Sequence, residues 1–493
     1  MSAALEALNR RLADLNALEK AGSILQWDRQ VLMPEGGAEA RTAHNKALMR
    51  MWHQLFTSDE TQNLVEKAGA EVDPESDEAG LLRVVRRNLS VQTKLPSELV
   101  ARKTQVSSDA YEAWRAARAA NDFRILQPFL EELFDINREV AELRGYQDHI
   151  YDALIDLFEE GSTRAQAKAL LDPLKEETRV LLDEMRESQG AVDDSFLAGN
   201  WDQEKLRSIM EQITREIGFD YNRGRLDITT NAFCTNFSRG DVRMTTRPSG
   251  TLKGIAFSSL HEMGHGLYEQ GSPAKWDRTP LAGGVSMVVH ESQSRTWENT
   301  VGRSRPFWQR FWPRFTSAFP ELAPYSAEQA FQAVAKVQPG LVRIGSDEVT
   351  YNLHIIVRFE LECEILTNVV AVKDLPEAWN EKMRAHLGVV PSNDTEGCLQ
   401  DVHWSRGSVG YFPTYAMGNL LGAQIWEKLS SELGDTDALI RDGKFDVILG
   451  WLQDRLYGLG KRYSPAETVR RVTGGYDHQA FVRTMRRKYG LMG

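Results

Sequence analysis

The sequence predicts a mainly α-helical protein, a single large helical body with a cleft and a small β-sheet beside one helix. Three observations support this. Residues 1–220 carry apolar side chains at helical spacing, 225–248 is rich in threonine and β-branched residues, and no long flexible linker separates domains. We therefore expect one domain over 1–493, with the chemistry within 225–415 and helices again over 416–493.

The N-terminal helices are predicted from an apolar stripe and three breaks. Leucines recur every three or four residues in the first helix, at Leu5, Leu8, Leu12, Leu15 and Leu18. Turn residues interrupt the pattern at Pro34-Glu35-Gly36-Gly37, Asp73-Pro74 and Leu95-Pro96-Ser97. Residues 101–145 follow as one long helix or a helix pair, whose many charges indicate a solvated face.

The stretch 225–248 is predicted to be a pair of strands. Ser238-Arg239-Gly240-Asp241 offers a turn between them. An edge strand here could hold an extended peptide by main-chain hydrogen bonds. A purely structural hairpin capping the helical body fits the pattern equally well.

The next segment carries His261-Glu262-Met263-Gly264-His265, an H-E-x-x-H pattern. We expect a helix over Ile255 to Gln270, which contains no proline, with Ser258 or Ser259 as its cap. Residues four apart share one face of a helix, so the two histidines can bind one zinc ion while Glu262 faces a water. Two solvated histidines on a surface helix are the alternative.

Two glycines, Gly264 and Gly266, lie inside this helix, where each costs about 1 kcal/mol relative to alanine. Close approach of another backbone would explain them. Glu269 lies two turns beyond His261, too far along a straight helix to share a metal with both histidines.

A catalytic zinc needs a third protein ligand. The metzincin pattern would place glycine and histidine where this chain has Tyr268 and Gly271, so that class is excluded. A Gly- and Pro-rich loop over 271–284 leads to a second helix, predicted to start near Ser286. The candidates there are His290, Glu291 and Glu298. Glu291 and Glu298 are seven residues apart and share a face, so periodicity alone cannot choose between them.

The rest of the chain is predicted to be helical except for one loop. Residues 345–372 form a long helical segment. Residues 397–420 are dense in Gly, Trp, Tyr and Pro, which is unusual in so helical a chain. Helices resume from there to the end.

Composition excludes several classes of partner. A net charge of −11 argues against nucleic acid and anionic membranes, and no run of 18 uncharged apolar residues could span a bilayer. The N-terminal residues carry charges throughout, unlike a signal peptide. The three cysteines, Cys234, Cys363 and Cys398, are few and far apart, so we expect no disulfides and a reducing, cytoplasmic location.

Several motifs together resemble the carboxypeptidase Taq family, thermostable-type HEXXH zinc metallocarboxypeptidases. They are spread over nearly the whole chain in matching order: Trp27-Asp28 with Met33-Pro34, Asp241-Val242-Arg243-Met244-Thr245, HEMGH at 261–265, HESQSR at 290–295, Arg343 to Asp347, GCLQDVHW at 397–404 and GYFPTY at 410–415.

The resemblance implies an almost wholly helical fold with a deep active-site groove and a homodimeric assembly. It implies that Glu291 completes the metal site of His261 and His265, holding zinc or cobalt. The expected activity is hydrolysis of the C-terminal peptide bond of peptides with a free C-terminus, with Glu262 as the general base. Alternatives are a metallo-oligopeptidase cutting short peptides internally and a catalytically impaired peptide-binding homologue.

Further site residues are expected from the same motifs. His403 and Tyr411 could donate hydrogen bonds to the oxyanion, although both residue types often serve as satisfied core groups. Arginine suits a terminal carboxylate because its planar fork can bind both oxygens. Arg343 is the first candidate and Arg243 the second, with a structural ion pair, such as Arg343 with Asp347, as the alternative.

The chain departs from the family pattern at two places. The usual His-Pro-Phe is replaced by Asn231-Ala232-Phe233, which we expect to alter substrate preference more than metal binding. The I-R-x-x-A-D motif contains Val342 and Ser346 instead of Ile and Ala, and these small changes are expected to have little effect.

Overall fold

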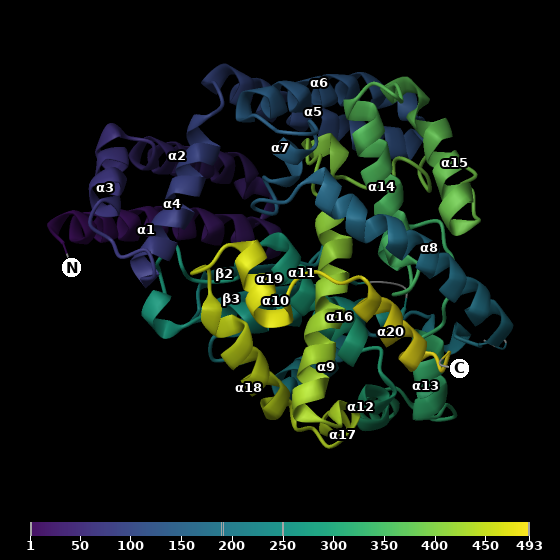
Figure 1. Cartoon of the computed structure of the whole chain (residues 1–493). Coiled ribbons are helices and arrows are strands. Elements are labelled where there is room, and N and C mark those ends of the chain that lie inside the picture. The colour runs from purple at the N-terminus through teal and green to yellow at the C-terminus, as the bar shows by residue number, and fades with distance from the viewer. Residues whose placement is uncertain (1, 189, 191, 249–250, 492–493) are drawn as a thin grey trace.

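The computed structural model describes residues 2–188, 190, 192–248 and 251–491 (Figure 1). The first half is helical up to a small sheet: α1 (Ala3–Val31), α2 (Ala38–Phe56), α3 (Asp59–Gly69), α4 (Asp77–Thr93), α5 (Ser97–Ala120), α6 (Gln127–Arg144), α7 (Asp152–Ile155), α8 (Arg164–Ser188) and α9 (Gln203–Ile217). The strands are β1 (Gly224–Ile228), β2 (Cys234–Ser238) and β3 (Asp241–Thr246). The predicted fold class is confirmed.

The second half is helical again. Its helices are α10 (Leu252–Gln270), α11 (Met287–Arg295), α12 (Arg305–Ala318), α13 (Ala327–Val334), α14 (Tyr351–Leu366), α15 (Leu375–Leu387), α16 (Pro413–Leu433), α17 (Thr436–Arg441), α18 (Phe445–Arg455), α19 (Pro465–Thr473) and α20 (Gln479–Lys488). Within the described ranges, none of the helices is long and apolar enough to cross a membrane.

The first four helices, α1 to α4, pack around a small core of their own at one end of the molecule (Figure 1). The leucine stripe of α1 faces this core: Leu5, Leu8, Leu12 and Leu15 are buried in it. Trp276 and Leu281, from the loop after α10, close it from the other side. The three predicted breaks all separate helices, because each holds residues that favour a turn.

The sheet has three strands in the order β1-β3-β2. The expected hairpin is β2 and β3, antiparallel around Ser238 to Asp241. The prediction of a single pair was wrong, because β1 adds to the far side of β3 in parallel. A parallel partner is joined by no tight turn, so it leaves no local signal. β2 is therefore an edge strand, as anticipated.

Three helices cross at the centre of the molecule. Helix α10 packs under β3, α11 crosses α10, and α16 packs on the other side of α11. A Cβ atom on Gly264 would lie 2.5 Å from the carbonyl oxygen of Gln293, and one on Gly418 would lie 2.6 Å from the Cβ of Glu291. The expected close approach of a second backbone to α10 is therefore present.

Helix starts differ from the expectation where side chains bind the backbone. Thr251, rather than Ser258 or Ser259, caps α10 by accepting a hydrogen bond from the amide of Gly254. Helix α11 starts where predicted, and Ser286 caps it by accepting a hydrogen bond from the amide of Val289. Helix α14 begins later than expected, at Tyr351, because Asp347 accepts the amide hydrogens of Val349 and Thr350 and holds a turn.

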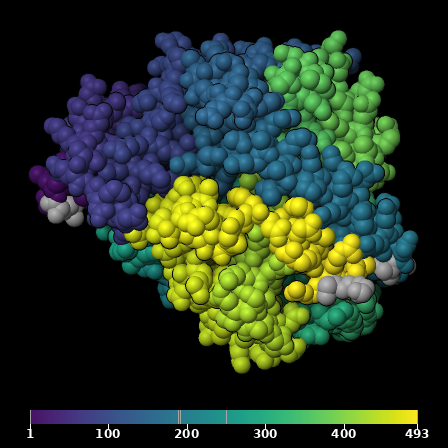
Figure 2. All heavy atoms as spheres, in the orientation of Figure 1, coloured from purple at the N-terminus to yellow at the C-terminus, as the bar shows by residue number. Residues whose placement is uncertain are grey.

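The C-terminal helices lie across one face of the molecule. Figure 2 shows the last part of the chain in yellow between the blue segment that contains α8 and the green helices below it. Helix α20 packs on α16 and α8. This placement brings Lys488, at the end of α20, within 2.5 Å of Glu348.

Candidate metal centre

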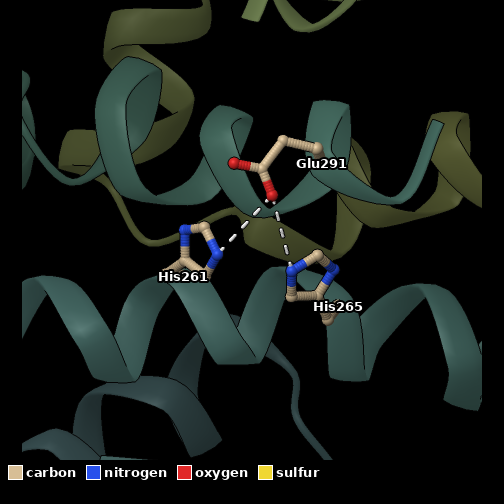
Figure 3. A group of neighbouring side chains, drawn as sticks. All are labelled: His261, His265 and Glu291. Atoms are coloured by element: carbon tan, nitrogen blue, oxygen red, sulfur yellow. Dashed lines mark ion pairs between the residues drawn. The ribbon is translucent and has the colours of Figure 1, made fainter. Parts of the chain in front are cut away.

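Three side chains from two helices point at one place (Figure 3). The Nε2 atoms of His261 and His265, one turn apart on α10, each lie 3.7 Å from Oε2 of Glu291 on α11. Ligands at about 2.1 Å in a tetrahedral site stand roughly 3.4 Å apart. The donor set of two imidazoles and one carboxylate therefore fits a single zinc-like ion. Among the described residues, this is the cluster whose donor atoms lie close enough to share a metal.

The other candidates for third ligand, Glu298 and His290, lie behind the histidines. Oε2 of Glu298 is 2.8 Å from Nδ1 of His261. A π-helical turn over Thr296–Val301 follows α11 and carries Glu298 to this place. Contacts of this kind orient a metal-binding imidazole and fix its tautomer.

His265 is supported differently, since its Nδ1 lies 3.3 Å from Nδ1 of His290. Nε2 of His290 is 2.7 Å from Oε1 of Glu269. Burial alone would raise the pKa of Glu269, but its hydrogen bond with His290 is the main cause that lowers it to about 2. Burial holds the pKa of His265 well below its usual range, so this imidazole is neutral, as a ligand must be.

The charges around His261 favour a cation. Burial lowers the pKa of His261, but the carboxylates of Glu291 and Glu298 outweigh it and raise the pKa to about 9. A proton or a metal ion is thus stabilised between His261 and these groups.

Glu291 is held in place by its neighbours on α11. Arg295 donates to Oε1 at 2.7 Å, and the hydroxyl of Ser294 donates to Oε2 at 3.0 Å. The side chain is only 5% exposed. Arg295 also donates to Glu298, so one guanidinium fixes both carboxylates.

Glu262 lies beside the cluster without joining it. Its side chain is 6% exposed, and burial is the main cause that raises its pKa to about 7. It lines a cavity of about 720 Å³ together with His261. A buried carboxylate at the wall of this groove has the position expected of a general base.

Comparisons with known proteins identify the family of the chain. The sequence profile of the carboxypeptidase Taq (M32) metallopeptidases matches residues 7–489. The chain belongs to this family. It is therefore a metallocarboxypeptidase, and neither alternative activity is needed.

Named relatives extend over the whole chain. Thermostable carboxypeptidase 1 of Thermus thermophilus is 38% identical, and that of Pyrococcus furiosus is 36% identical, each over 96% of both chains. The solved structure of the Pyrococcus furiosus carboxypeptidase superposes with a TM-score of 0.97 and covers 99% of both chains at 34% identity.

Arg343 lines the same cavity as His261 and Glu262 of this M32 carboxypeptidase. Its guanidinium donates to Asp401 at 2.7 Å and to the hydroxyl of Tyr351 at 2.8 Å. The partner is Asp401 rather than Asp347, which binds the backbone of its own turn. Asp401 lies 58 positions away in sequence, so spacing gave no sign of it.

Arg243 lies elsewhere. Asp241 accepts two hydrogen bonds from it, and its guanidinium is 4.2 Å from the ring centre of Trp27. The contact with Trp27 joins β3 to α1, while the bonds with Asp241 lie within β3. They correspond to the ion-pair alternative, and Arg243 is not part of the wall that holds His261 and Glu262.

His403 and Tyr411 lie together, with ring centres 5.5 Å apart. The Nε2 of His403 is 3.2 Å from the hydroxyl of Tyr415. Burial lowers the pKa of His403 to about 4, so the ring is neutral. Burial, with Glu291 close by, raises the pKa of Tyr411 to about 12, so its hydroxyl keeps its proton and remains a donor.

The structure adds one residue that the motifs did not indicate. Arg247, just after β3, lines the cavity with Asn231 and Ala232. Among the described residues, no side-chain or backbone acceptor pairs with its guanidinium. Two of the residues that depart from the family pattern, Asn231 and Ala232, therefore share a cavity wall with this arginine.

Proposed function

We propose that His261, His265 and Glu291 hold one divalent ion, zinc or cobalt, and that Glu262 is the general base in removing the C-terminal residue of peptides. The observation that carries this proposal is the 3.7 Å distance from Nε2 of each histidine to Oε2 of Glu291, beside a buried glutamate in a cavity. When bound, such an ion lowers the pKa of water and polarises a carbonyl.

Glu262 would take a proton from the attacking water and later give it to the leaving amine. Two donors are available for the oxyanion, the hydroxyl of Tyr411 and the imidazole of His403. Both are neutral at physiological pH, so each can donate without first gaining or losing a proton.

The open edge of β2 is the proposed track for the peptide. The carbonyl of Phe233 accepts a hydrogen bond from the amide of Thr245, so the alternating pattern turns the backbone groups of Cys234 and Asn236 outward. Lys20 already donates to the outward carbonyl of Asn236 at 3.3 Å. The groups of Cys234 remain for a substrate main chain.

The terminal carboxylate is proposed to bind at Arg343 and Arg247. Both line the cavity, and no acceptor among the described residues occupies the planar guanidinium of Arg247. Arg343 is fixed by Asp401, which limits its free donors but sets its orientation.

The test compares peptides with a free C-terminus and the same peptides amidated. We expect release of the last amino acid from the free acid only. Equal cleavage of the amidated form would favour internal cutting and contradict the proposal. Losing a charge-assisted contact costs about 1.5–3 kcal/mol, so Arg247→Lys and Arg343→Lys should each lower kcat/KM for the free acid roughly 10- to 100-fold. Arg243→Lys is the matched control and should leave the acid preference unchanged.

We further propose that the protein is a homodimer in the reducing cytoplasm. The three cysteines are free, which is consistent with a reducing compartment. Light scattering at several concentrations tests the assembly, and a monomer throughout would contradict it.

A further inference from the structure

One metal-binding histidine is supported by a second histidine instead of a carboxylate. His261 meets Glu298 directly, at 2.8 Å. The Nδ1 of His265 meets His290, and Nε2 of His290 in turn meets the carboxylate of Glu269. The two proposed ligands of the same ion thus have different hydrogen-bond partners: a carboxylate for His261 and an imidazole for His265.

His265, His290 and Glu269 form a row of hydrogen-bonded side chains. The proposed metal site determines which nitrogen atoms in this row carry hydrogens. If Nε2 of His265 binds the ion through its lone pair, its ring hydrogen is on Nδ1. That hydrogen is donated to Nδ1 of His290, 3.3 Å away. His290 then carries its own hydrogen on Nε2 and donates it to Oε1 of Glu269 at 2.7 Å. Every donor in the row meets an acceptor.

The backbone leaves room for the side chains of His290 and Glu269 at Gly283 and Gly284. A Cβ atom on Gly284 would lie 2.3 Å from Nε2 of His290, and one on Gly283 would lie 2.7 Å from Oε2 of Glu269. The amide of Gly284 donates to Oε1 of Glu269 at 3.1 Å. The ring of Tyr268 packs 4.9 Å from that of His290. The pair therefore lies in a fitted pocket.

The row continues to the N-terminal helices. The side-chain amide of Asn236 donates through Nδ2 to Oε2 of Glu269, and Lys20 of α1 donates to Oδ1 of the same side chain at 2.8 Å. Asn236 belongs to β2, the proposed peptide track. One chain of hydrogen bonds thus runs from α1 past the edge strand to a metal ligand.

We propose that His290 and Glu269 are positioning residues for the reaction: they hold His265 in the tautomer and orientation in which its Nε2 binds the ion. The inference rests on the proposed metal site. It assigns Glu269, which lies too far along α10 to be a ligand, a role through His290.

The experiment measures zinc affinity by competition with a chelator and records the visible spectrum of the cobalt-loaded protein. His290→Phe keeps a ring but removes the acceptor, and His290→Asn keeps an acceptor near the Nδ1 position. Outer contacts of this kind are worth roughly 10- to 100-fold in affinity. We expect that loss and a shifted cobalt spectrum for His290→Phe, with partial rescue in His290→Asn.

Glu269→Gln is the second variant, in case a phenylalanine at 290 prevents folding. It keeps the shape but removes the charge, and we expect a weaker effect in the same direction. Zinc affinity and a cobalt spectrum equal to wild type in a folded His290→Phe or Glu269→Gln protein would overturn the proposal. Complete loss of binding in His290→Phe, as severe as in Glu291→Ala, would also overturn it, because His290 would then be a ligand.

The wild-type protein separates this inference from the proposed function. If wild type binds no stoichiometric metal, the metal site itself fails. If wild type binds one ion and the variants bind it equally well, only the positioning role fails.

Discussion

At the scale of single residues, the position of Glu291 depends on one glycine in the neighbouring helix. The backbone of α16 passes so close that a Cβ on Gly418 would meet the Cβ of Glu291 at 2.6 Å. Arg295 and Ser294 fix the carboxylate from its own helix. The proposed third ligand is thus held in position by packing as well as by hydrogen bonds.

Gly418→Ala is therefore expected to displace Glu291 and weaken zinc binding at least tenfold. Gly422→Ala, one turn further along α16, is the control. Its Cβ would press on the carbonyl of Ser292 at 2.9 Å rather than on a ligand, so stability should fall with little change in affinity. Chelator competition and thermal unfolding measure the two effects. Equal affinities in the two variants would contradict the account.

A second residue beneath α11 makes stability depend on pH. Glu159 accepts hydrogen bonds from the hydroxyl of Ser286 at 2.9 Å and the amide of Val288 at 3.1 Å. Burial raises its pKa to about 8, although these bonds oppose the shift. The folded state therefore binds the proton more tightly than the unfolded state, whose carboxyl has a pKa near 4.3.

A raised pKa in the folded state means that this contribution is complete below about pH 4 and lost as pH rises through about 8. We expect the melting temperature of the metal-free protein to fall over this range, by an amount that Glu159→Gln reduces. Thermal scans from pH 5 to 9 provide the measurement. Identical pH dependence in wild type and variant would rule out Glu159 as the cause.

The departure at Asn231-Ala232 lies at the cavity wall, so it should affect substrates rather than the metal. Restoring the family residues with Asn231→His and Ala232→Pro is expected to change the order of preferred C-terminal residues severalfold in KM, with metal content unchanged. Elemental analysis and kinetics on a peptide series test both parts. A loss of metal would be the contrary result.

The proposed metal ligands on α10 could be identified from sequence because both lie on one helix, four residues apart. Glu291 needed the family resemblance, since Glu298 lies seven residues further on and shares its helix face. The partners Asp401 of Arg343 and Glu269 of His290 could not be predicted, because the contacts join segments far apart in the chain. Arg247 stood in no motif.

At the scale of elements, the close crossing of α10 and α11 positions the site. Gly264 lies where the Cα of Ser294 would be 2.6 Å from an added Cβ. Alanine there would gain about 1 kcal/mol in helix propensity, but overpacking costs roughly 1–3 kcal/mol. The cost of overpacking should exceed the gain in helix propensity, because the atoms that an added Cβ would meet belong to the backbone of α11 and cannot move aside easily.

Gly264→Ala is thus expected to lower the free energy of unfolding by up to about 2 kcal/mol and to weaken metal binding. Gly450→Ala is the matched control in helix α18, where an added Cβ would meet nothing within 4 Å. It should stabilise the protein by about 0.5–1 kcal/mol. Denaturant unfolding gives both values, and stabilisation by Gly264→Ala would contradict the crossing geometry.

Elements with local signals were predicted well. The stripe of α1, the breaks between the first helices and the cap of α11 all depend on residues within a few positions. The parallel strand β1 and the start of α10 at Thr251 were not predicted. The first depends on a distant pairing and the second on which of several hydroxyls meets the free amides.

At the scale of the whole molecule, the C-terminal helix is tied to the wall of the groove. Lys488 donates to Glu348, a cavity residue, and to the carbonyl of Asn299 at 3.2 Å. Tyr489 donates to the same carboxylate at 2.9 Å. The ion pair is buried, so the end of the chain supports the site although it lies far from it in sequence.

Lys488→Met leaves Glu348 buried without its cation, which typically costs about 3–5 kcal/mol. Arg483→Met, on the same helix, removes an ion pair with Glu427 whose arginine is half exposed, and should cost about 0–1 kcal/mol. Denaturant unfolding compares them, and adding Glu348→Gln should rescue the first. Equal losses of unfolding free energy in the two variants would contradict a stabilising role for the buried Lys488–Glu348 ion pair.

The central claim is that His261, His265 and Glu291 hold one metal ion that Glu262 uses to remove C-terminal residues. The most direct measurement is metal stoichiometry and turnover of a free-acid peptide for wild type, Glu262→Gln and Glu291→Ala. We predict one bound ion without turnover in Glu262→Gln, and loss of both metal and turnover in Glu291→Ala. Turnover by Glu262→Gln at the wild-type rate, or unweakened binding by Glu291→Ala, would contradict the account.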